Sequence, residues 1–171
     1  FSGILYCGLA LTSRGLRVVE FNARFGDPET QVVLERLASP FAPLLLAAAQ
    51  GDLSAVDAPE WVEGAAVTVV VASAGYPVSA QIGDPITGIE EAERLGAHVI
   101  HAGTAVSGED VVTAGGRVLA VVGRGADLAQ ARERAYAGVE RIRFDGAQWR
   151  TDIGLKAERG EITVPGTEGA K

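Results

Sequence analysis

The pattern of apolar and polar positions predicts a β-hairpin at the start of the chain. Residues 4–12 are apolar and β-prone, residues 13–15 have the composition of a tight turn, and residues 16–22 are again rich in β-formers. Because successive side chains of a strand point to opposite faces, Glu20 and Asn22 are predicted to share one face of the second strand. A carboxylate and an amide are therefore expected to point the same way.

Two helices are predicted to follow the hairpin. The sequence Asp-Pro-Glu at 27–29 is a helix-start pattern with Asp27 as the N-cap, and the helix is expected to run to about residue 38. Its buried side is predicted to carry three apolar residues, Val33, Leu34 and Leu37. A second, apolar helix is expected after Ser39-Pro40 and ends at Gly51, because glycine is the typical residue beyond a helix C-terminus.

The pattern changes after a polar linker at residues 52–63, and a second unit is predicted from residue 64 onward. Its expected elements are a buried strand at 66–72, a helix at 89–95, a strand at 98–101, a hairpin of 111–113 with 117–123 about Gly115-Gly116, and a helix at 127–142. The predicted fold class is therefore α+β. We expect units at 1–63 and 64–159 and a polar tail at 160–171.

Composition and charge limit the classes of partner. The 22 acidic and 15 basic residues give a net charge of −7, so nucleic acid is not an expected partner. No apolar stretch reaches the roughly 18 residues of a membrane span and no signal-peptide pattern is present, so we expect no membrane partner and a cytoplasmic protein. Cys7 lies in an apolar strand and is expected to be a small core residue. Because the chain has no methionine and opens inside a strand, an N-terminal part of the same protein is expected to be missing.

The densest group of polar side chains spans residues 20–29. Glu20 and Asn22 offer the hard oxygen ligands that Mg²⁺ takes in proteins. Arg24 offers a fork of donors suited to a carboxylate or a phosphate, and Glu29 would lie at a helix N-terminus, positioned to hold an amine or to orient Arg24. A solvated strand face followed by a plain helix cap is the alternative interpretation. The density of polar residues favours a site.

Three further residues are weaker candidates. His98 and His101 are three residues apart on a predicted strand, so they face opposite ways and do not form a metal pair. His98 is interpreted as structural, while His101 stays open between a structural and a substrate-side role. Arg117 follows two glycines and is a candidate for packing or for a substrate-side contact.

A series of motifs, in one order along the chain, carries a family resemblance. They are Gly3-Ile4-Leu5-Tyr6, the segment from Glu20 to Glu29, Ala74-Gly75-Tyr76-Pro77, His101-Ala102-Gly103-Thr104, the segment from Thr113 to Leu119, and the segment from Arg150 to Gly154. Together they resemble the phosphoribosylamine–glycine ligases, or glycinamide ribonucleotide synthetases, which are ATP-grasp enzymes of purine biosynthesis. The resemblance implies the C-terminal part of an ATP-grasp domain followed by a small mixed α/β domain. Because the family's N-terminal domain and lid are absent, the chain alone is expected to be inactive.

The resemblance also implies an activity and roles for the residues of the site. The family ligates glycine to 5-phosphoribosylamine with ATP, through glycyl phosphate, and forms glycinamide ribonucleotide, ADP and phosphate. On this basis Glu20 and Asn22 bind Mg²⁺ or Mn²⁺, Arg24 is catalytic, and Asp27 and Glu29 bind the amino substrate. Two alternatives stay open: another ATP-grasp ligase or carboxylase, and a non-catalytic domain that keeps the fold.

Overall fold

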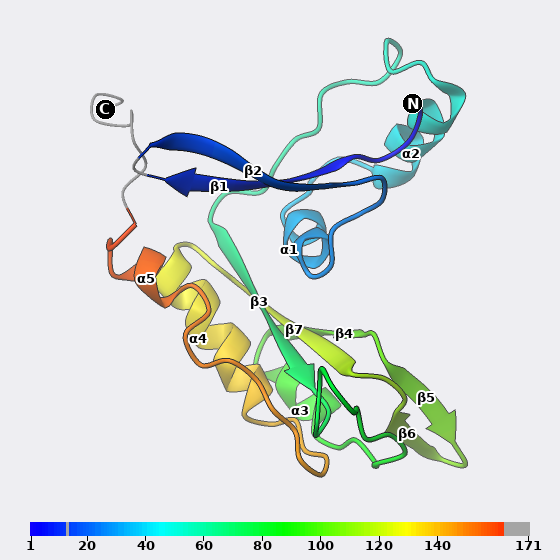
Figure 1. Cartoon of the computed structure of the whole chain (residues 1–171), viewed down its shortest axis with the longest axis vertical. Coiled ribbons are helices and arrows are strands. Elements are labelled where there is room, and N and C mark those ends of the chain that lie inside the picture. The colour runs from blue at the N-terminus through cyan, green and yellow to red at the C-terminus, as the bar shows by residue number, and fades with distance from the viewer. Residues whose placement is uncertain (13, 163–171) are drawn as a thin grey trace.

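The computed structural model describes residues 1–12 and 14–162, whose strands form three small antiparallel sheets (Figure 1). The sheets are the hairpin β1 (Tyr6–Thr12) with β2 (Gly15–Asn22), a three-stranded sheet in the order β3 (Ala65–Ala72), β7 (Arg117–Gly125), β4 (Ala97–His101), and the pair β5 (Thr104–Ser107) with β6 (Asp110–Thr113). The helices are α1 (Glu29–Glu35), α2 (Phe41–Gln50), α3 (Ile89–Arg94), α4 (Leu128–Val139) and α5 (Leu155–Glu158). This mixture confirms the predicted α+β class.

The hydrophobic core lies between the three-stranded sheet and α4. The apolar runs of β3 and β7 bury Val69, Val71 and Val121, because one face of both strands is covered by the helix. Small residues allow a close approach: a side chain at Gly123 would overlap the backbone of α4. The N-cap of α4 is Asp127, whose carboxylate accepts a hydrogen bond from the backbone N–H of Gln130 at 2.8 Å.

Helix α1 packs on the same sheet, although it precedes the linker in sequence. It contacts β3 and β7, and Glu35 at its end lies 2.9 Å from His98 Nδ1 and 3.7 Å from Arg124 Nη1. His98 and Arg124 alternate along their strands with residues that face α4. Helix α1 therefore lies on the opposite side of the sheet from α4. The two helices therefore sandwich the sheet.

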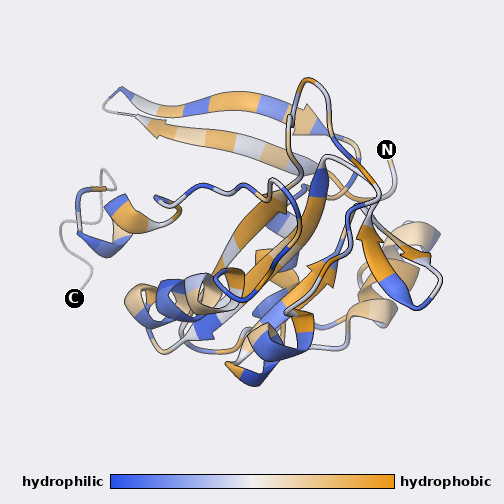
Figure 2. Cartoon of the chain, turned by 90° about the horizontal axis from the view of Figure 1, so that it is seen from below, coloured by the Kyte–Doolittle hydropathy of each residue, from blue (hydrophilic) through white to orange (hydrophobic). Residues whose placement is uncertain are grey.

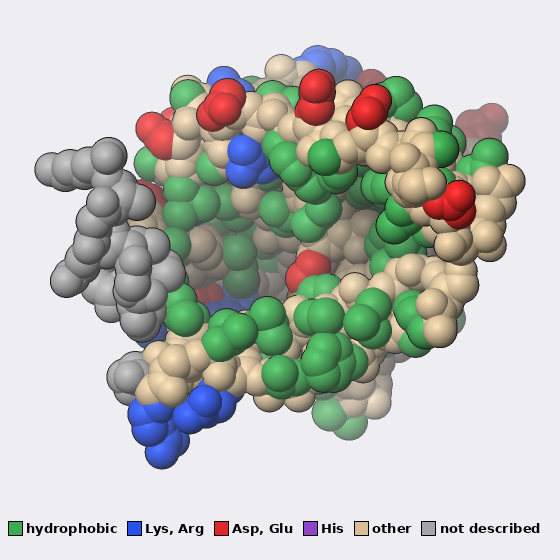
Figure 3. Space-filling model, turned by 90° about the horizontal axis from the view of Figure 1, so that it is seen from above, with side chains coloured by type: hydrophobic (Ala, Val, Ile, Leu, Met, Phe, Trp, Pro, Cys, Tyr) green, Lys and Arg blue, Asp and Glu red, His purple; other side chains and the backbone are tan. Residues whose placement is uncertain are grey.

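The hairpin projects from this body and exposes apolar side chains on both faces. Its apolar stretches stand apart from the sheet and helices in Figure 2, and hydrophobic side chains form a band along it in Figure 3. The predicted core position of Cys7 is wrong, because this side chain is exposed. The predicted buried side of the first helix is wrong in part, since Val33 and Leu34 are 49% and 37% exposed. Both elements therefore leave apolar side chains exposed within the described part of the chain.

Two local predictions are also wrong. Pro28, not Asp27, is the N-cap of α1, and the Asp27 carboxylate accepts a hydrogen bond from Gln31 Nε2 at 2.9 Å instead. Residues 111–113 and 117–123 do not pair with each other: β6 pairs with β5, and β7 pairs with β3 and β4. Ala114 N–H bonds to the carbonyl of Gly103 at 2.7 Å, so the intervening segment crosses between sheets.

The remaining predictions for the second unit agree with the structure in element type, with ends that differ by up to three residues. Most of the predicted polar tail, residues 163–171, lies outside the described residues, as does residue 13 of the predicted turn. No helix in the described part of the chain is long and apolar enough to cross a membrane.

Candidate functional site

The structure brings Glu20 and Asn22 together at the end of β2. Asn22 Nδ2 donates a hydrogen bond to Glu20 Oε1 at 2.8 Å, as expected for side chains that share a strand face. Across the hairpin, Gly8 is paired with Glu20 and Tyr6 with Asn22. A Cβ atom at Gly8 would lie 3.0 Å from Glu20 Cγ, so the glycine leaves room for the carboxylate.

Tyr6 and Glu29 extend this group toward the start of α1. A Cβ atom at Gly26 would lie 2.6 Å from Glu29 Oε2 and 3.0 Å from Tyr6 Cδ2, so both side chains pack over that glycine. Burial of the phenol raises the pKa of Tyr6, as do its hydrogen bond to Glu29, the charge of Glu29 and the charge of Glu20. Tyr6 therefore lies close to two carboxylates. Its position opposite Asn22 in the hairpin register was the signal in the sequence that could have identified it.

Glu20 and Asn22 are the donor set that the end of β2 offers a metal ion. No group of three or more His, Cys, Asp or Glu side chains among the described residues could hold a metal by itself. Mg²⁺ commonly takes one or two protein oxygens and completes its shell with water and phosphate oxygens. The pair fits a divalent cation shared with a phosphate-bearing ligand.

Arg24 and Asp27 lie in the segment between β2 and α1. Arg24 Nη1 donates to the backbone carbonyl of Phe25 at 2.8 Å, and within the described residues its guanidinium has no carboxylate partner. Asp27 instead meets a side chain from the second unit. Arg117 Nη1 donates to the Asp27 carbonyl oxygen at 3.0 Å and lies 3.9 Å from Asp27 Oδ2. The predicted contact between Glu29 and Arg24 is not formed as an ion pair among these residues.

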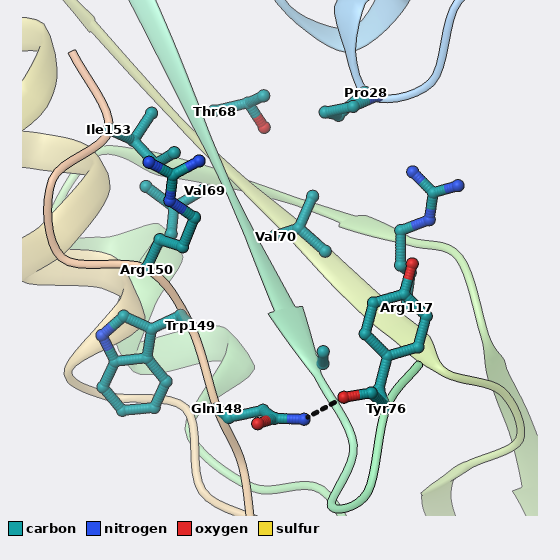
Figure 4. Close-up of a pocket in the computed structure, with 11 residues that line it drawn as sticks. Pro28, Thr68, Val69, Val70, Tyr76, Arg117, Gln148, Trp149, Arg150 and Ile153 are labelled. Carbon is teal, nitrogen blue, oxygen red and sulfur yellow. Dashed lines mark hydrogen bonds between the residues drawn. The ribbon is translucent and has the colours of Figure 1, made fainter. Parts of the chain in front are cut away.

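A cavity of about 410 Å³ adjoins the Asp27–Pro28 turn (Figure 4). Its wall combines the outer face of β3 with the loop after β3 and with residues 148–153. Residues that line it include Pro28, Val70, Tyr76, Arg117, Gln148 and Arg150. Figure 4 shows Arg117 on the same side of this cavity as Pro28. Local sequence patterns do not indicate this cavity, because its walls come from segments far apart in the chain.

Two polar side chains of the cavity wall differ in whether they have a hydrogen-bond partner. Arg150 is paired with Asp152 through two hydrogen bonds of 2.9 Å and 2.7 Å, and this contact lowers the pKa of Asp152. Thr68 is only 9% exposed, and its Oγ1 has no hydrogen-bond partner within the described structure. An unpaired buried hydroxyl is costly, so this oxygen is a point at which a ligand or water would gain a hydrogen bond.

The two histidines lie apart, as predicted. His98 Nδ1 is 2.9 Å from Glu35 Oε2, and His101 Nδ1 is 3.0 Å from Thr104 Oγ1. His98 therefore has a structural contact with α1. The ring of His101 is hydrogen-bonded within its own turn, and the role of this residue stays a prediction.

Comparisons with known proteins agree with the motifs along the chain. Residues 66–156 match the C domain of phosphoribosylglycinamide synthetase, and residues 1–30 match its ATP-grasp (A) domain. The phosphoribosylamine–glycine ligase of Streptomyces coelicolor is 60% identical over 160 residues, which cover 92% of this chain and 38% of the relative. The ligase of Mycobacterium tuberculosis is 52% identical over 165 residues, covering 96% of this chain and 38% of the relative.

Solved structures give the same picture. The phosphoribosylamine–glycine ligase of Thermotoga maritima superposes with a TM-score of 0.74 at 36% identity, over 86% of this chain and 36% of that protein. N5-carboxyaminoimidazole ribonucleotide synthetase from the same organism shares the fold alone. Its TM-score is 0.60 at 18% identity, over 84% of this chain and 37% of that protein. Since the C-domain match alone covers more than half of the chain, the chain belongs to the phosphoribosylglycinamide synthetase family.

Proposed function

We propose that this chain is the C-terminal part of a phosphoribosylamine–glycine ligase and acts together with an N-terminal part of the same cytoplasmic protein. The chain spans about 38% of the length of the curated relatives that it matches. The apolar side chains exposed on both faces of the hairpin support this proposal, because they need a covering surface. The single observation that carries it is 60% identity to such a ligase over 92% of the chain, with the Glu20–Asn22 pair formed.

The proposed reaction joins two substrates at the expense of ATP, in purine biosynthesis. The glycine carboxylate attacks the γ-phosphorus of ATP, so that ADP leaves and glycyl phosphate forms. The amine of 5-phosphoribosylamine then attacks the acyl carbon, phosphate leaves, and the nitrogen loses a proton to give glycinamide ribonucleotide. Because water would destroy an acyl phosphate, this chemistry needs a closed site.

The residues at the end of β2 and in the following turn carry the proposed roles. Glu20 and Asn22 hold Mg²⁺ or Mn²⁺, which when bound neutralises negative charge on the nucleotide phosphates. Arg24 is the proposed catalytic residue, because one of its N–H groups bonds to a backbone carbonyl while the rest of its fork is available to an anion. Asp27 and Glu29 offer carboxylates to the amino group of glycine.

The cavity beside the Asp27–Pro28 turn is the space that this chain offers to the second substrate. The unpartnered hydroxyl of Thr68 supplies a hydrogen-bonding group within it. Arg150 lies along the same wall. A hydroxyl-bearing phosphoribosyl group has the chemistry to use these donors.

The test measures ADP release by a full-length ligase that carries this chain, with 5-phosphoribosylamine generated in situ, with and without glycine. We expect glycine-dependent ADP release that Glu20→Gln abolishes. Glu90→Gln is the matched control, because Glu90 pairs only with Arg94 on the surface of α3. ADP release that is indifferent to glycine would contradict the proposed substrate, and dependence on bicarbonate would favour a carboxylase. The chain by itself should show no turnover.

A further inference from the structure

Three motifs to which the proposed reaction assigns no chemical step meet around the backbone of Arg117. Gly103, from the motif after β4, packs so closely that a Cβ atom there would lie 2.6 Å from the Arg117 carbonyl oxygen. A side chain at Gly116 would overlap the ring of Tyr76, which belongs to the motif after β3. The three motifs therefore form one packed unit at the start of β7.

Hydrogen bonds fix the same unit from both sides. Ser73 N–H donates to the Gly116 carbonyl at 2.9 Å, and Ser73 Oγ donates to the Gly115 carbonyl at 3.1 Å. Gly103 N–H donates to the Val118 carbonyl at 3.1 Å. The backbone on either side of Arg117 is thus held by hydrogen bonds to the carbonyls of Gly116 and Val118, and close packing leaves no room for a side chain at Gly103 or Gly116. A backbone held this firmly restricts the direction of the side chain that it carries.

The Arg117 side chain donates a hydrogen bond to Asp27, a residue 90 positions away in the chain. Its Nη1 donates to the Asp27 carbonyl oxygen at 3.0 Å and lies 3.9 Å from the Asp27 carboxylate. Asp27 immediately precedes Pro28 and the first turn of α1, which begins at Glu29. A fixed carbonyl at Asp27 therefore fixes where α1 starts and where the Glu29 carboxylate lies.

We propose that Arg117 is a positioning residue: the three glycine-containing motifs hold its backbone, and its guanidinium fixes the Asp27–Pro28 turn and thereby the carboxylates of Asp27 and Glu29. The consequence for catalysis rests on the proposed function. The effect on the turn does not. Arg124, on the same strand, provides a comparison. Its guanidinium is paired with Glu35 at the far end of α1, and its side chain has a similar exposure of 46%, against 42% for Arg117.

The test measures amide hydrogen exchange of residues 25–31 in a full-length ligase that carries this chain, without substrates. Arg117→Gln should speed exchange in this segment by roughly 10-fold, the loss expected for one charge-assisted hydrogen bond at a partly exposed site. Arg117→Lys should restore part of the protection, and Arg124→Gln should leave it unchanged. Gly116→Ala should loosen the same segment, because it displaces the backbone of Arg117.

Activity gives a second readout with a distinct pattern. Arg117→Gln should raise KM for glycine and leave KM for ATP unchanged. Unchanged exchange in residues 25–31 would overturn the proposal, and if KM for phosphoribosylamine alone rose, Arg117 would be a substrate contact instead. An equal increase in exchange along β7 would also overturn it, because the effect would then be a general loss of stability. Since exchange is read without substrates, a failed ligase assay would count only against the proposed function.

Discussion

Gly123→Ala tests how closely α4 packs on the sheet. A Cβ atom at residue 123 would overlap the carbonyl oxygen of Ala131 and the amide nitrogen of Ala135, and would lie 3.0 Å from Ala135 Cα. Carbon atoms in good contact are about 3.5–4.0 Å apart, so the helix must move. Overpacking costs about 1–3 kcal/mol. The upper end of this cost applies here, because backbone atoms cannot rotate away from the new methyl group. Alanine also lowers the conformational entropy of the unfolded chain, which stabilises the folded protein by about 0.4–1 kcal/mol.

The expected net loss is therefore about 2 kcal/mol of the free energy of unfolding. Urea denaturation followed by circular dichroism would show it as a lower midpoint with an unchanged slope. Gly8→Ala is the matched control: this strand glycine meets the flexible Glu20 side chain at 3.0 Å, so its substitution should be nearly neutral. A Gly123→Ala variant within about 0.5 kcal/mol of the parent chain would refute the close helix–sheet contact.

Three other predictions concern single side chains. Thr68→Val should raise the free energy of unfolding by about 1 kcal/mol in urea denaturation, because it removes a buried hydroxyl without a partner. Glu29→Gln should lower the raised pKa of Tyr6 toward its ordinary value, since a neighbouring carboxylate disfavours the phenolate. Tyrosinate absorbance during an alkaline titration, corrected with Tyr6→Phe, would measure the change. An unchanged pKa of Tyr6 would contradict its contact with Glu29. Ile142→Ala should cost about 2–5 kcal/mol in thermal unfolding, since this side chain is 1% exposed.

The sequence was most informative where burial and periodicity agree. The apolar run at 66–72 and the spacing of three and four residues in 127–142 both correspond to observed elements, β3 and α4. Both lie against the core, so each residue's environment follows from its position in the repeat. The Glu20–Asn22 pair was predictable for a similar reason, because a strand's period of two places both on one face.

Features that depend on distant partners were not predictable. Val33 and Leu34 have the spacing of a buried face, yet they stay 49% and 37% exposed although α1 contacts the sheet. The partner of residues 111–113 is β5 rather than the following strand, and local turn signals cannot decide between two such pairings. The contact of Arg117 with Asp27 spans 90 residues, and no local pattern indicates it.

The position of α1 limits how members of this family can be recombined. Helix α1, which precedes the linker, packs on the sheet that follows the linker, and Glu35 contacts His98 and Arg124 there. A chimera joined within residues 52–63 would set one parent's helix against the other parent's sheet. Substitutions on these two surfaces should therefore occur in compensating pairs, and viable crossovers should fall upstream of residue 25, so that the turn, the helix and the sheet are inherited together.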